Sequence, residues 1–506
     1  MEYKIKPWQH QFDKAIFPAR KEPNFGLLWD MGTGKTSATI NILREHYAHE
    51  RRLLRTLIFC PLIVIRNWQQ EIRQHSKIRD SDVVALVGPG KKRIKIFTEN
   101  AVDSKTLALT QGRIFICNYE SMEMAGLLSH LKEWQPEIIV CDESHRLKSI
   151  SSVRAKGVIS LLGEKAVVGS NPVQYTRAAK HVYILTGTPL LNSAQDIFNQ
   201  YRILDSGETF GLNFYEFRHR FFEDINKGMP SRIHFPKWMP RHDTYEKFNA
   251  LIYKKATRVL KADCLDLPPL VRQRIYVELS PLQRRLYDEM KRDYITWIKQ
   301  KKSEPRAVVA QMALTKMLRL QQIVSGFCKT EDGTEIPLKD NPRLDAMGDL
   351  IDEITDNHKL IIWATFHHNY KQLAELCKHR KVKYAELHGG ITAVEKDKNV
   401  ESFRRNSDCR VIIANQAAAG IGINLVEDRA IVSEGRSSYS VYYSKNFSLE
   451  QDQQSEARNY RGGSEVYESV TRIDLVASDT IDELILEALA AKKSMAEEVL
   501  HWSDNL

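Results

Sequence analysis

The sequence predicts an α/β protein built from two parallel sheets in tandem. Short apolar runs rich in β-branched and aromatic residues alternate with helical stretches, first in residues 24–186 and again in residues 359–477. Because helices cover both faces of a parallel sheet, its strands read as continuous apolar runs rather than as alternations. The 506 residues exceed what one hydrophobic core fills, and 42% apolar with 27% charged residues is typical of a globular protein.

Strand-like runs occur in two groups. In each group the runs are separated by stretches in which apolar side chains have helical spacing. The first sheet is expected to contain residues 24–29, 56–60, 113–118, 137–142 and 181–186. The second sheet is expected to contain residues 359–366, 382–388, 409–415, 429–434 and 469–477.

The residues between the two groups have a different composition. Residues 214–222 and 233–242 are aromatic and basic, whereas residues 281–302 and 306–323 have a helical pattern and many Lys and Arg side chains. No sheet is expected there. We therefore predict four segments: an N-terminal lobe 1–205, a helical insertion and interlobe linker 206–340, a C-terminal lobe 341–478 and a C-terminal helical segment 479–506.

The charge and the cysteines restrict the class of protein. There are 74 Lys and Arg against 64 Asp and Glu, a net charge of +10, which favours a polyanionic partner such as nucleic acid. Seven scattered cysteines, none in a C-x-x-C pair, predict reduced thiols in the cytoplasm, with no disulfide framework and no zinc site. No run of about 18 uncharged apolar residues occurs, so no membrane span is expected.

The most informative local feature is WDMGTGKT at residues 29–36, between a predicted strand and a predicted helix. Its glycines allow backbone N–H groups to face a phosphate, its Lys adds charge, and its final Thr hydroxyl is suited to Mg²⁺. The general phosphate-loop pattern has Gly where this chain has Trp29, and a plain glycine-rich turn is the alternative. The residues expected to contact a nucleotide are Met31, Gly32, Thr33, Gly34, Lys35 and Thr36.

A pair of carboxylates follows another predicted strand, in IIVCDESH at residues 138–145. Asp142 is suited to bind Mg²⁺ together with Thr36, and Glu143 is suited to polarise an attacking water. An acidic pair after a strand is by itself common in solvated loops. Next to a phosphate loop, it predicts a nucleoside-triphosphate hydrolase that uses Mg²⁺.

Several segments together resemble one family. DESHRLKS (142–149), LTGTPLLN (185–192), AAGIGINL (418–425) and QSEARNYRGG (454–463) are similar to motifs of the Swi/Snf family of superfamily-two DNA-dependent ATPases. The ordered match extends from KPWQ (6–9) to about Arg461. The resemblance implies two RecA-like lobes joined through a helical insertion, with ATP and Mg²⁺ as cofactors and DNA as partner.

The resemblance also implies roles for individual residues. Lys35, Asp142 and Glu143 would act on ATP in the first lobe, and Arg458 and Arg461 would reach the γ-phosphate from the second, although a solvated helix face is the alternative for these arginines. Gln9 would recognise adenine, with Gln11 as the rival position. In the second lobe, Gly422 and Gln454 would contact the nucleotide.

DNA contacts are expected from loops in both lobes and from basic clusters. The family motifs place these contacts at Pro61, Asn67, Asn118, Thr186, Gly187, Thr188, Gly389, Ala419 and Gly420. Residues 51–55, 91–95 and 253–261 are basic, and each is either a phosphate contact or a solvated face. The aromatic residues 214–242 either stack on bases or pack in a core.

The predicted activity is ATP-driven movement along double-stranded or branched DNA by a monomer in the cytoplasm of a bacterium or of a phage-infected host. The resemblance is nearest to the fork-remodelling and annealing-helicase branch. A helicase that separates strands of DNA or RNA, and a motor that removes DNA-bound proteins, are alternatives. A third alternative is not an enzyme: a protein that clamps DNA in a nucleotide-dependent way without hydrolysing ATP.

Overall fold

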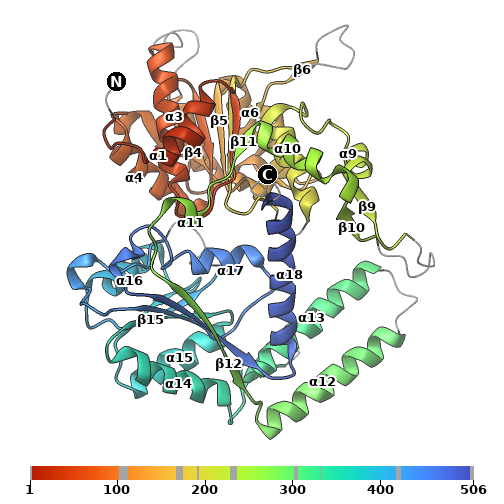
Figure 1. The fold of residues 1–506 in the computed structure, drawn as a ribbon, viewed down its shortest axis with the longest axis vertical. Coiled ribbons are helices and arrows are strands. Elements are labelled where there is room, and N and C mark those ends of the chain that lie inside the picture. Colours follow the sequence, from red (N-terminus) through yellow and green to blue (C-terminus); the bar gives the residue numbers. More distant parts are fainter. Residues whose placement is uncertain are drawn as a thin grey trace. The chain divides into compact units, whose positions relative to one another are not determined.

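The computed structural model describes residues 3–101, 112–166, 175–190, 193–227, 236–300, 306–330, 332–417 and 423–501. The chain forms two compact units (Figure 1). Unit 1 comprises Met1–Leu265 and Lys492–Leu506, and unit 2 comprises Asp266–Ala491. The segment 206–340 was expected to be an insertion and linker. The boundary between the units divides it, so that residues up to Leu265 belong to unit 1 and residues from Asp266 belong to unit 2.

Unit 1 contains a seven-stranded sheet of order β11-β1-β8-β5-β2-β4-β3, in which every pairing is parallel. All five strands predicted in this half are present. The strands are β1 (Asn24–Leu27), β2 (Thr56–Phe59), β3 (Val83–Ala85), β4 (Ile114–Cys117), β5 (Ile138–Asp142), β8 (His181–Leu185) and β11 (Ala256–Thr257). The short strands β3 and β11 lie at the sheet edges and were not predicted.

Helices cover this sheet and supply its core with apolar side chains. They are α3 (Lys35–Glu50), α4 (Ile65–His75), α5 (Gly90–Asn100), α6 (Ala125–Trp134), α7 (Val153–Leu161) and α8 (Ile197–Asp205). The central strands β2, β4 and β5 are buried along their whole length. This explains why they read as uninterrupted apolar runs in the sequence.

The aromatic segment after α8 packs in the core of unit 1. It forms α9 (Phe214–Phe221), the antiparallel pair β9 (Phe222–Asp224) and β10 (Trp238–Pro240), and α10 (Tyr245–Lys254). Phe217, Phe221 and Phe248 are almost fully buried, and their rings lie 5.2–6.1 Å apart. Of the two readings of this segment, core packing therefore accounts for Phe217 and Phe221.

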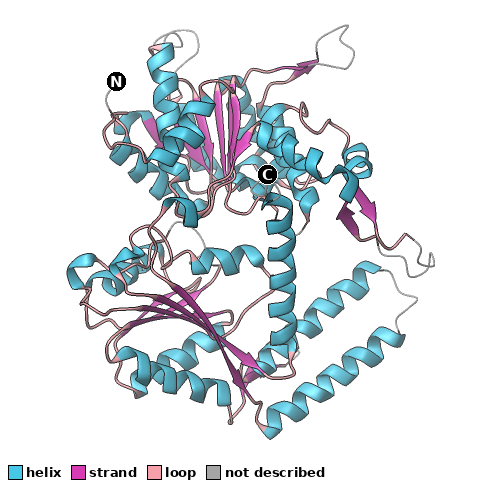
Figure 2. Cartoon of the chain, viewed as in Figure 1, coloured by secondary structure: helices cyan, strands magenta, loops and turns pink. Residues whose placement is uncertain are grey.

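Unit 2 contains a six-stranded parallel sheet of order β12-β19-β18-β15-β17-β16. In Figures 1 and 2, α14 and α15 lie on one face of this sheet and α16 and α17 on the other. The strands are β12 (Leu270–Val277), β15 (Lys359–Ala364), β16 (Tyr384–Leu387), β17 (Val411–Asn415), β18 (Ser438–Tyr442) and β19 (Val470–Ala477). The helices are α14 (Pro342–Thr355), α15 (His367–His379), α16 (Ala393–Arg405) and α17 (Leu449–Glu456), and α18 (Ile481–His501) begins in unit 2 and continues into unit 1 from Lys492.

Two sequence predictions for unit 2 were wrong. Residues 429–434 are not a strand, because this segment is mostly exposed and contains a 3-10 turn at Arg429–Ile431. The strand between β15 and β19 is instead β18, whose two serines reduce its apolar signal. The polar edge strand β12 was also missed, within the segment where no sheet was expected.

The long helices predicted between the sheets are present. Figure 1 shows α12 (Pro281–Gln300) and α13 (Arg306–Val324) running side by side in unit 2. A two-stranded hairpin of β13 (Phe327–Lys329) and β14 (Glu335–Pro337) follows. No helix within the described residues is long and apolar enough to cross a membrane.

Candidate active site

Three loops of unit 1 meet at one edge of its sheet. The strands β1, β8 and β5 are neighbours in the sheet. The phosphate loop at residues 29–36 follows β1, the residues 142–145 end β5, and the residues 186–189 follow β8. Because the carboxyl ends of parallel strands share one edge, which is where α/β sheets bind ligands, these separated motifs form one site.

The phosphate loop has the backbone of an anion site. Gly32 and Gly34 have φ values of 87° and 82°, a left-handed region that glycine adopts without steric cost. Gly34 precedes the first turn of α3, whose N–H groups have no partner within the helix. Lys35 Nζ donates to the carbonyl oxygens of Trp29 and Asp30 at 2.9 and 3.1 Å. Donors, charge and helix dipole thus fit the phosphates of a nucleotide.

The tryptophan that departs from the phosphate-loop pattern lies inside unit 1. Trp29 is fully buried, and its Nε1 donates to Thr257 Oγ1 at 3.0 Å. A backbone hydrogen bond also holds the loop, because Asp30 N–H donates to Val259 O at 2.9 Å. The turn toward phosphate depends on Gly32 and Gly34, so Trp29 acts as an anchor. No signal in the sequence paired residues 257–259 with this loop.

The remaining phosphate-loop residues are tied to their neighbours. Thr33 Oγ1 donates to Asp30 O at 2.8 Å, and its carbonyl accepts from His10 Nε2 at 2.9 Å. Met31 lies against the loop after β8, because a Cβ at Gly187 would be 3.0 Å from Met31 Cγ. Thr36 is half-buried in the first turn of α3.

The two glutamines near the N-terminus have different surroundings. Gln9 Nε2 donates to Asp13 at 2.9 Å in an exposed position. Gln11 is buried, and its Nε2 donates to Gly34 O at 3.2 Å and to Ser37 Oγ at 2.9 Å. The structure therefore brings the alternative position, Gln11, to the phosphate loop.

Asp142 is a buried carboxylate with a raised pKa. Trp68 Nε1 donates to Asp142 Oδ2 at 2.8 Å. Burial raises the pKa of Asp142 to about 6, and the neighbouring Glu143 adds to this, while Trp68 and Lys35 oppose it. The sequence analysis did not connect Trp68 with Asp142, which is 74 residues further along the chain.

Glu143 has a strained backbone and an unsatisfied side chain. Its φ of 53° lies in the left-handed region, which a residue with a long side chain rarely adopts. Among the described residues, the buried atoms Glu143 Oε2 and Thr188 Oγ1 have no hydrogen-bond partner. Glu143 and Thr188 follow β5 and β8 at the edge where the phosphate loop lies, so a ligand or an ordered water bound there would satisfy both atoms.

His145 connects the carboxylates to the loop after β8. Its Nδ1 lies 3.4 Å from Glu143 Oε2 and 3.0 Å from Thr186 Oγ1. Thr186 Oγ1 also accepts from Thr188 N–H at 3.1 Å. Ser144 Oγ donates to Gln200 Oε1 at 2.7 Å.

Most residues of unit 1 that were expected to contact DNA have buried side chains. Asn118 Oδ1 accepts from Arg93 Nη1 at 2.5 Å and from Ser121 Oγ at 2.9 Å. Thr186 and Pro61 are also buried, whereas Asn67 and Gly187 are half-buried. If these segments contact DNA, the side chain of Asn118 acts by holding its loop.

In unit 2, two arginines converge on one carbonyl group. Arg458 Nη1 and Arg461 Nη1 donate to Ile423 O at 3.0 and 3.4 Å. Arg458 is buried, so a solvated helix face does not describe it. Gln454 is buried, and its Nε2 donates to Glu450 Oε1 at 3.2 Å. Gly389 lies in an open loop after β16, and the expected sites Ala419, Gly420 and Gly422 fall outside the described residues.

A buried ion network holds α17, the helix that precedes these arginines. Arg472 on β19 contacts Asp452 and Glu456 of α17 at 2.7 and 2.9 Å, and Asp474 at 3.3 Å. Burial acts to raise the pKa of Asp452, but the charges of Lys445 and Arg472 outweigh it and lower that pKa below its ordinary value. Sequence reasoning missed this network, because its members are far apart in the chain.

The comparison with known families decides the identity of this arrangement. The SNF2-related domain matches residues 18–326, and the helicase conserved C-terminal domain matches residues 342–463. The chain belongs to the SNF2-related family. As a member of this family, it is a DNA-dependent ATPase, in agreement with the resemblance that the motifs indicated.

Relatives of this SNF2-family chain differ in length. It is 24% identical to "Putative protein p41" of Acyrthosiphon pisum secondary endosymbiont phage 1, over 98% of this chain and 97% of that protein. It is 24% identical to the CHD3-type chromatin-remodeling factor PICKLE of Arabidopsis thaliana, over 96% of this chain and 33% of that protein. It is 22% identical to the DNA repair and recombination protein RAD54-like of Gallus gallus, over 93% of this chain and 63% of that protein.

A solved structure is similar along most of this SNF2-family chain. It is the Sulfolobus solfataricus SWI2/SNF2 ATPase core in complex with dsDNA, with 23% identity and a TM-score of 0.42, covering 98% of this chain and 93% of that one. Among the relatives named above, the chain spans a third of PICKLE, less than two thirds of the RAD54-like protein and nearly all of the phage protein.

Proposed function

We propose that this protein couples ATP hydrolysis to movement along double-stranded or branched DNA. The observation that carries the proposal is the chain of contacts from Glu143 through His145 to Thr186, which joins the carboxylates to the loop after β8. If a change at the nucleotide moved Glu143, the displacement would reach Thr186 through His145 alone. Movement on DNA requires a link of this kind between the two ligand sites.

The nucleotide would be held by the phosphate loop. The first-turn N–H groups of α3 and the ammonium of Lys35 face its phosphates, and Lys35 exchanges the carbonyl oxygens of Trp29 and Asp30 for them. Gln11, which already contacts this loop, is the better candidate than Gln9 for recognising the base. Met31 and Thr33 support the loop from its sides.

The catalytic roles follow from the two carboxylates. When bound, Mg²⁺ would neutralise charge on the phosphates, and Thr36 and Asp142 are the groups placed to hold it. Ionised Asp142 is favoured by the nearby Lys35 and by the hydrogen bond from Trp68. Glu143 has an unsatisfied buried oxygen with which it would orient the attacking water and accept its proton.

Unit 2 would supply Arg458 and Arg461 to neutralise charge on the γ-phosphate during hydrolysis. Both guanidinium groups are already gathered at Ile423 O, and the ion network around Arg472 holds α17, the helix that precedes them. Gln454 would support the same region. The loop residues Gly389, Ala419, Gly420 and Gly422 are proposed as points where small side chains let the backbone approach DNA or nucleotide.

Contact with the duplex along which the protein moves would depend mainly on the lysines of α5, because parts of the other two basic clusters are paired internally. Arg52 pairs with Glu137, and Lys255 is buried beside Glu208, so internal carboxylates neutralise part of those clusters. Lys91 and Lys92, in contrast, are exposed on the first turn of α5. Such charges would bind phosphates without reading sequence, and the binding would weaken as salt rises.

The test compares DNA structures as activators of ATP hydrolysis. Duplex, forked and single-stranded DNA are added in turn, and we expect the strongest stimulation with duplex or forked DNA. Displacement of a triplex-forming third strand would report translocation, whereas displacement of a strand from a fork would report unwinding. Stimulation without either displacement contradicts movement, and hydrolysis that no DNA stimulates contradicts the whole proposal.

The proposal includes a cellular setting and a preferred DNA structure. The phage protein that this chain matches along nearly its whole length supports a compact motor acting in a bacterial or phage-infected cytoplasm. Remodelling of forks or junctions is the process for which forked DNA should be the best activator. If plain duplex activates equally well, the fork-specific role is wrong while translocation stands.

A further inference from the structure

A cavity of unit 1 lies at the end of the sheet opposite to the phosphate loop. It encloses about 290 Å³, and its wall includes Leu53, which precedes β2, and Gly112, which precedes β4. The cavity is therefore at the amino ends of the strands. Helix α3 separates the two sites, because it begins at the phosphate loop and its 16 residues extend about 24 Å.

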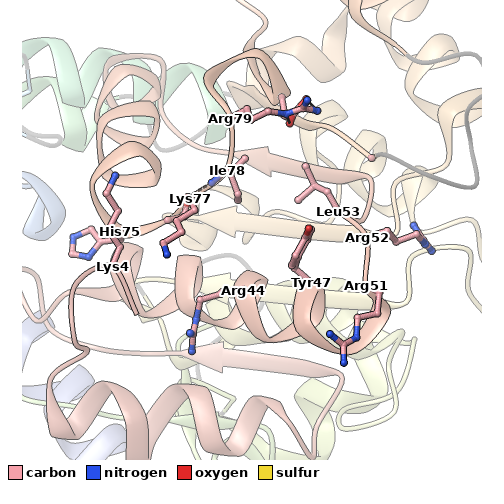
Figure 3. A pocket seen from close by; sticks show the side chains of 13 residues that line it. Lys4, Arg44, Tyr47, Arg51, Arg52, Leu53, His75, Lys77, Ile78 and Arg79 are labelled. Carbon is pink, nitrogen blue, oxygen red and sulfur yellow. Dashed lines mark hydrogen bonds and ion pairs between the residues drawn. The ribbon is translucent and has the colours of Figure 1, made fainter. Parts of the chain in front are cut away.

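The wall of this cavity is strongly basic. Figure 3 shows Lys4, His75 and Lys77 on one side of the hollow and Arg51 and Arg52 on the other. Asp82 is the one carboxylate in the wall among the described residues. The basic side chains are Lys4, Arg44, Arg51, Arg52, His75, Lys77 and Arg79.

Some of these cations are fixed by internal partners, and two are not. Arg52 forms a fork with Glu137 at 2.8 and 2.6 Å, and Arg79 pairs with Asp82 at 2.8 Å. Arg51 and Lys77 are exposed, and their side chains make no ion pair or hydrogen bond within the described part of the chain. The cavity therefore has positive charge that its own carboxylates do not neutralise.

Arg51 ends α3 at the wall of the cavity. Its φ of 57° is left-handed, and its N–H closes the end of α3 by donating to Tyr47 O at 2.9 Å. Glycine is the residue that this position of a helix favours, because it has no Cβ to strain. Gln135 and Ser206 end α6 and α8 in the same conformation, so the backbone of Arg51 serves to end the helix, and its exposed side chain remains available at the cavity.

The base of the cavity is apolar and partly aromatic. Tyr47 is 37% exposed, and Leu53 and Ile78 lie in the same wall. An aromatic surface beside cations suits a planar ring joined to a phosphate. We propose that this cavity binds a phosphorylated nucleotide unit, with the base against Tyr47 and the phosphate between Arg51 and Lys77.

One nucleotide unit has two sources, a free nucleotide or the 5′-phosphorylated end of a DNA strand. Binding is measured by fluorescence anisotropy with 5′-phosphorylated oligothymidylate of four residues, labelled at its 3′ end. Saturating ADP and Mg²⁺ keep the phosphate loop occupied. Competition by dTMP indicates a free nucleotide, whereas competition only by phosphorylated oligonucleotide indicates a strand end.

Two variants and a matched control test the site. The Arg51→Gln, Lys77→Gln double variant should raise the Kd at least tenfold, and Tyr47→Leu at least threefold. The control, Lys132→Gln with Lys156→Gln, removes two exposed charges from α6 and α7 of the same unit and should change the Kd less than twofold. Basal ATP hydrolysis should be unchanged in all three, which separates this proposal from the proposed function. No binding by the parent, or equal losses in the cavity and control variants, would overturn it.

Discussion

Replacing Trp68 by Phe should move the acid limb of the ATPase pH profile upward. The change removes the 2.8 Å hydrogen bond from Trp68 Nε1 to the buried Asp142 Oδ2. A hydrogen bond to a charged group contributes about 1.5–3 kcal/mol, and 1.36 kcal/mol corresponds to one pKa unit. Because this bond favours the ionised form, its loss should raise the pKa of Asp142 by about one to two units from about 6.

The consequence for activity depends on pH in a defined direction. With a pKa of about 6, about nine-tenths of Asp142 is ionised at pH 7, and after the change about one half to one tenth would be. Hydrolysis at pH 7 should fall accordingly and recover toward the parental rate near pH 9, since only ionised Asp142 holds the metal. The assay is kcat/KM of DNA-stimulated hydrolysis between pH 5 and 9.

A matched control is available in unit 2. Trp363 is also fully buried, but its Nε1 has no hydrogen-bond partner among the described residues. Trp363→Phe should therefore lower stability to a similar extent and leave the pH profile unmoved. An acid limb that stays in place in folded Trp68→Phe protein would refute the proposed role of this hydrogen bond.

Three further substitutions address separate links in the mechanism. Glu143→Gln should lower hydrolysis by about 10²–10⁴-fold while ATP binding, measured by calorimetry, persists; hydrolysis at the parental rate would remove its role as base. Thr186→Val removes the hydrogen bond with His145 but keeps the shape of the side chain. Stimulation of hydrolysis by DNA should therefore fall about fivefold or more, with basal hydrolysis retained. Unchanged stimulation would exclude this link. Arg472→Met leaves the buried acidic groups of α17 and β19 without their main partner, so urea unfolding should show a loss of about 3–5 kcal/mol, and a loss under 1 kcal/mol would contradict the network.

The fold was predictable wherever burial made strands uniformly apolar. The runs at β2, β4 and β5 are buried from end to end, and the sequence located each of them. β18 was missed because Ser438 and Ser440 are buried in it as small polar side chains, which a search for apolar runs does not detect. β12 lies at a sheet edge with most of its residues exposed and none buried, and it resembled a linker for that reason.

The site was predictable where residues are local and less so where the fold assembles it. Gly34 and Lys35 could be placed from a short motif, because the loop's own backbone and charge define the phosphate site. Gln9 and Gln11 are both near the motif in sequence, and only the packing of Gln11 on Gly34 separates them. The partner of Asp142 is 74 residues away at Trp68, a contact that spacing alone does not reveal.

The left-handed backbone at Glu143 has a consequence for the evolution of this protein. A non-glycine residue with this conformation costs of order 1 kcal/mol, and the raised pKa of its neighbour Asp142 shows that ionising that carboxylate is also unfavourable. Asparagine or glycine at position 143 would relax the first cost, and asparagine at position 142 the second. Laboratory selection for thermal stability alone should therefore enrich inactive proteins, with replacements concentrated at these two neighbouring positions.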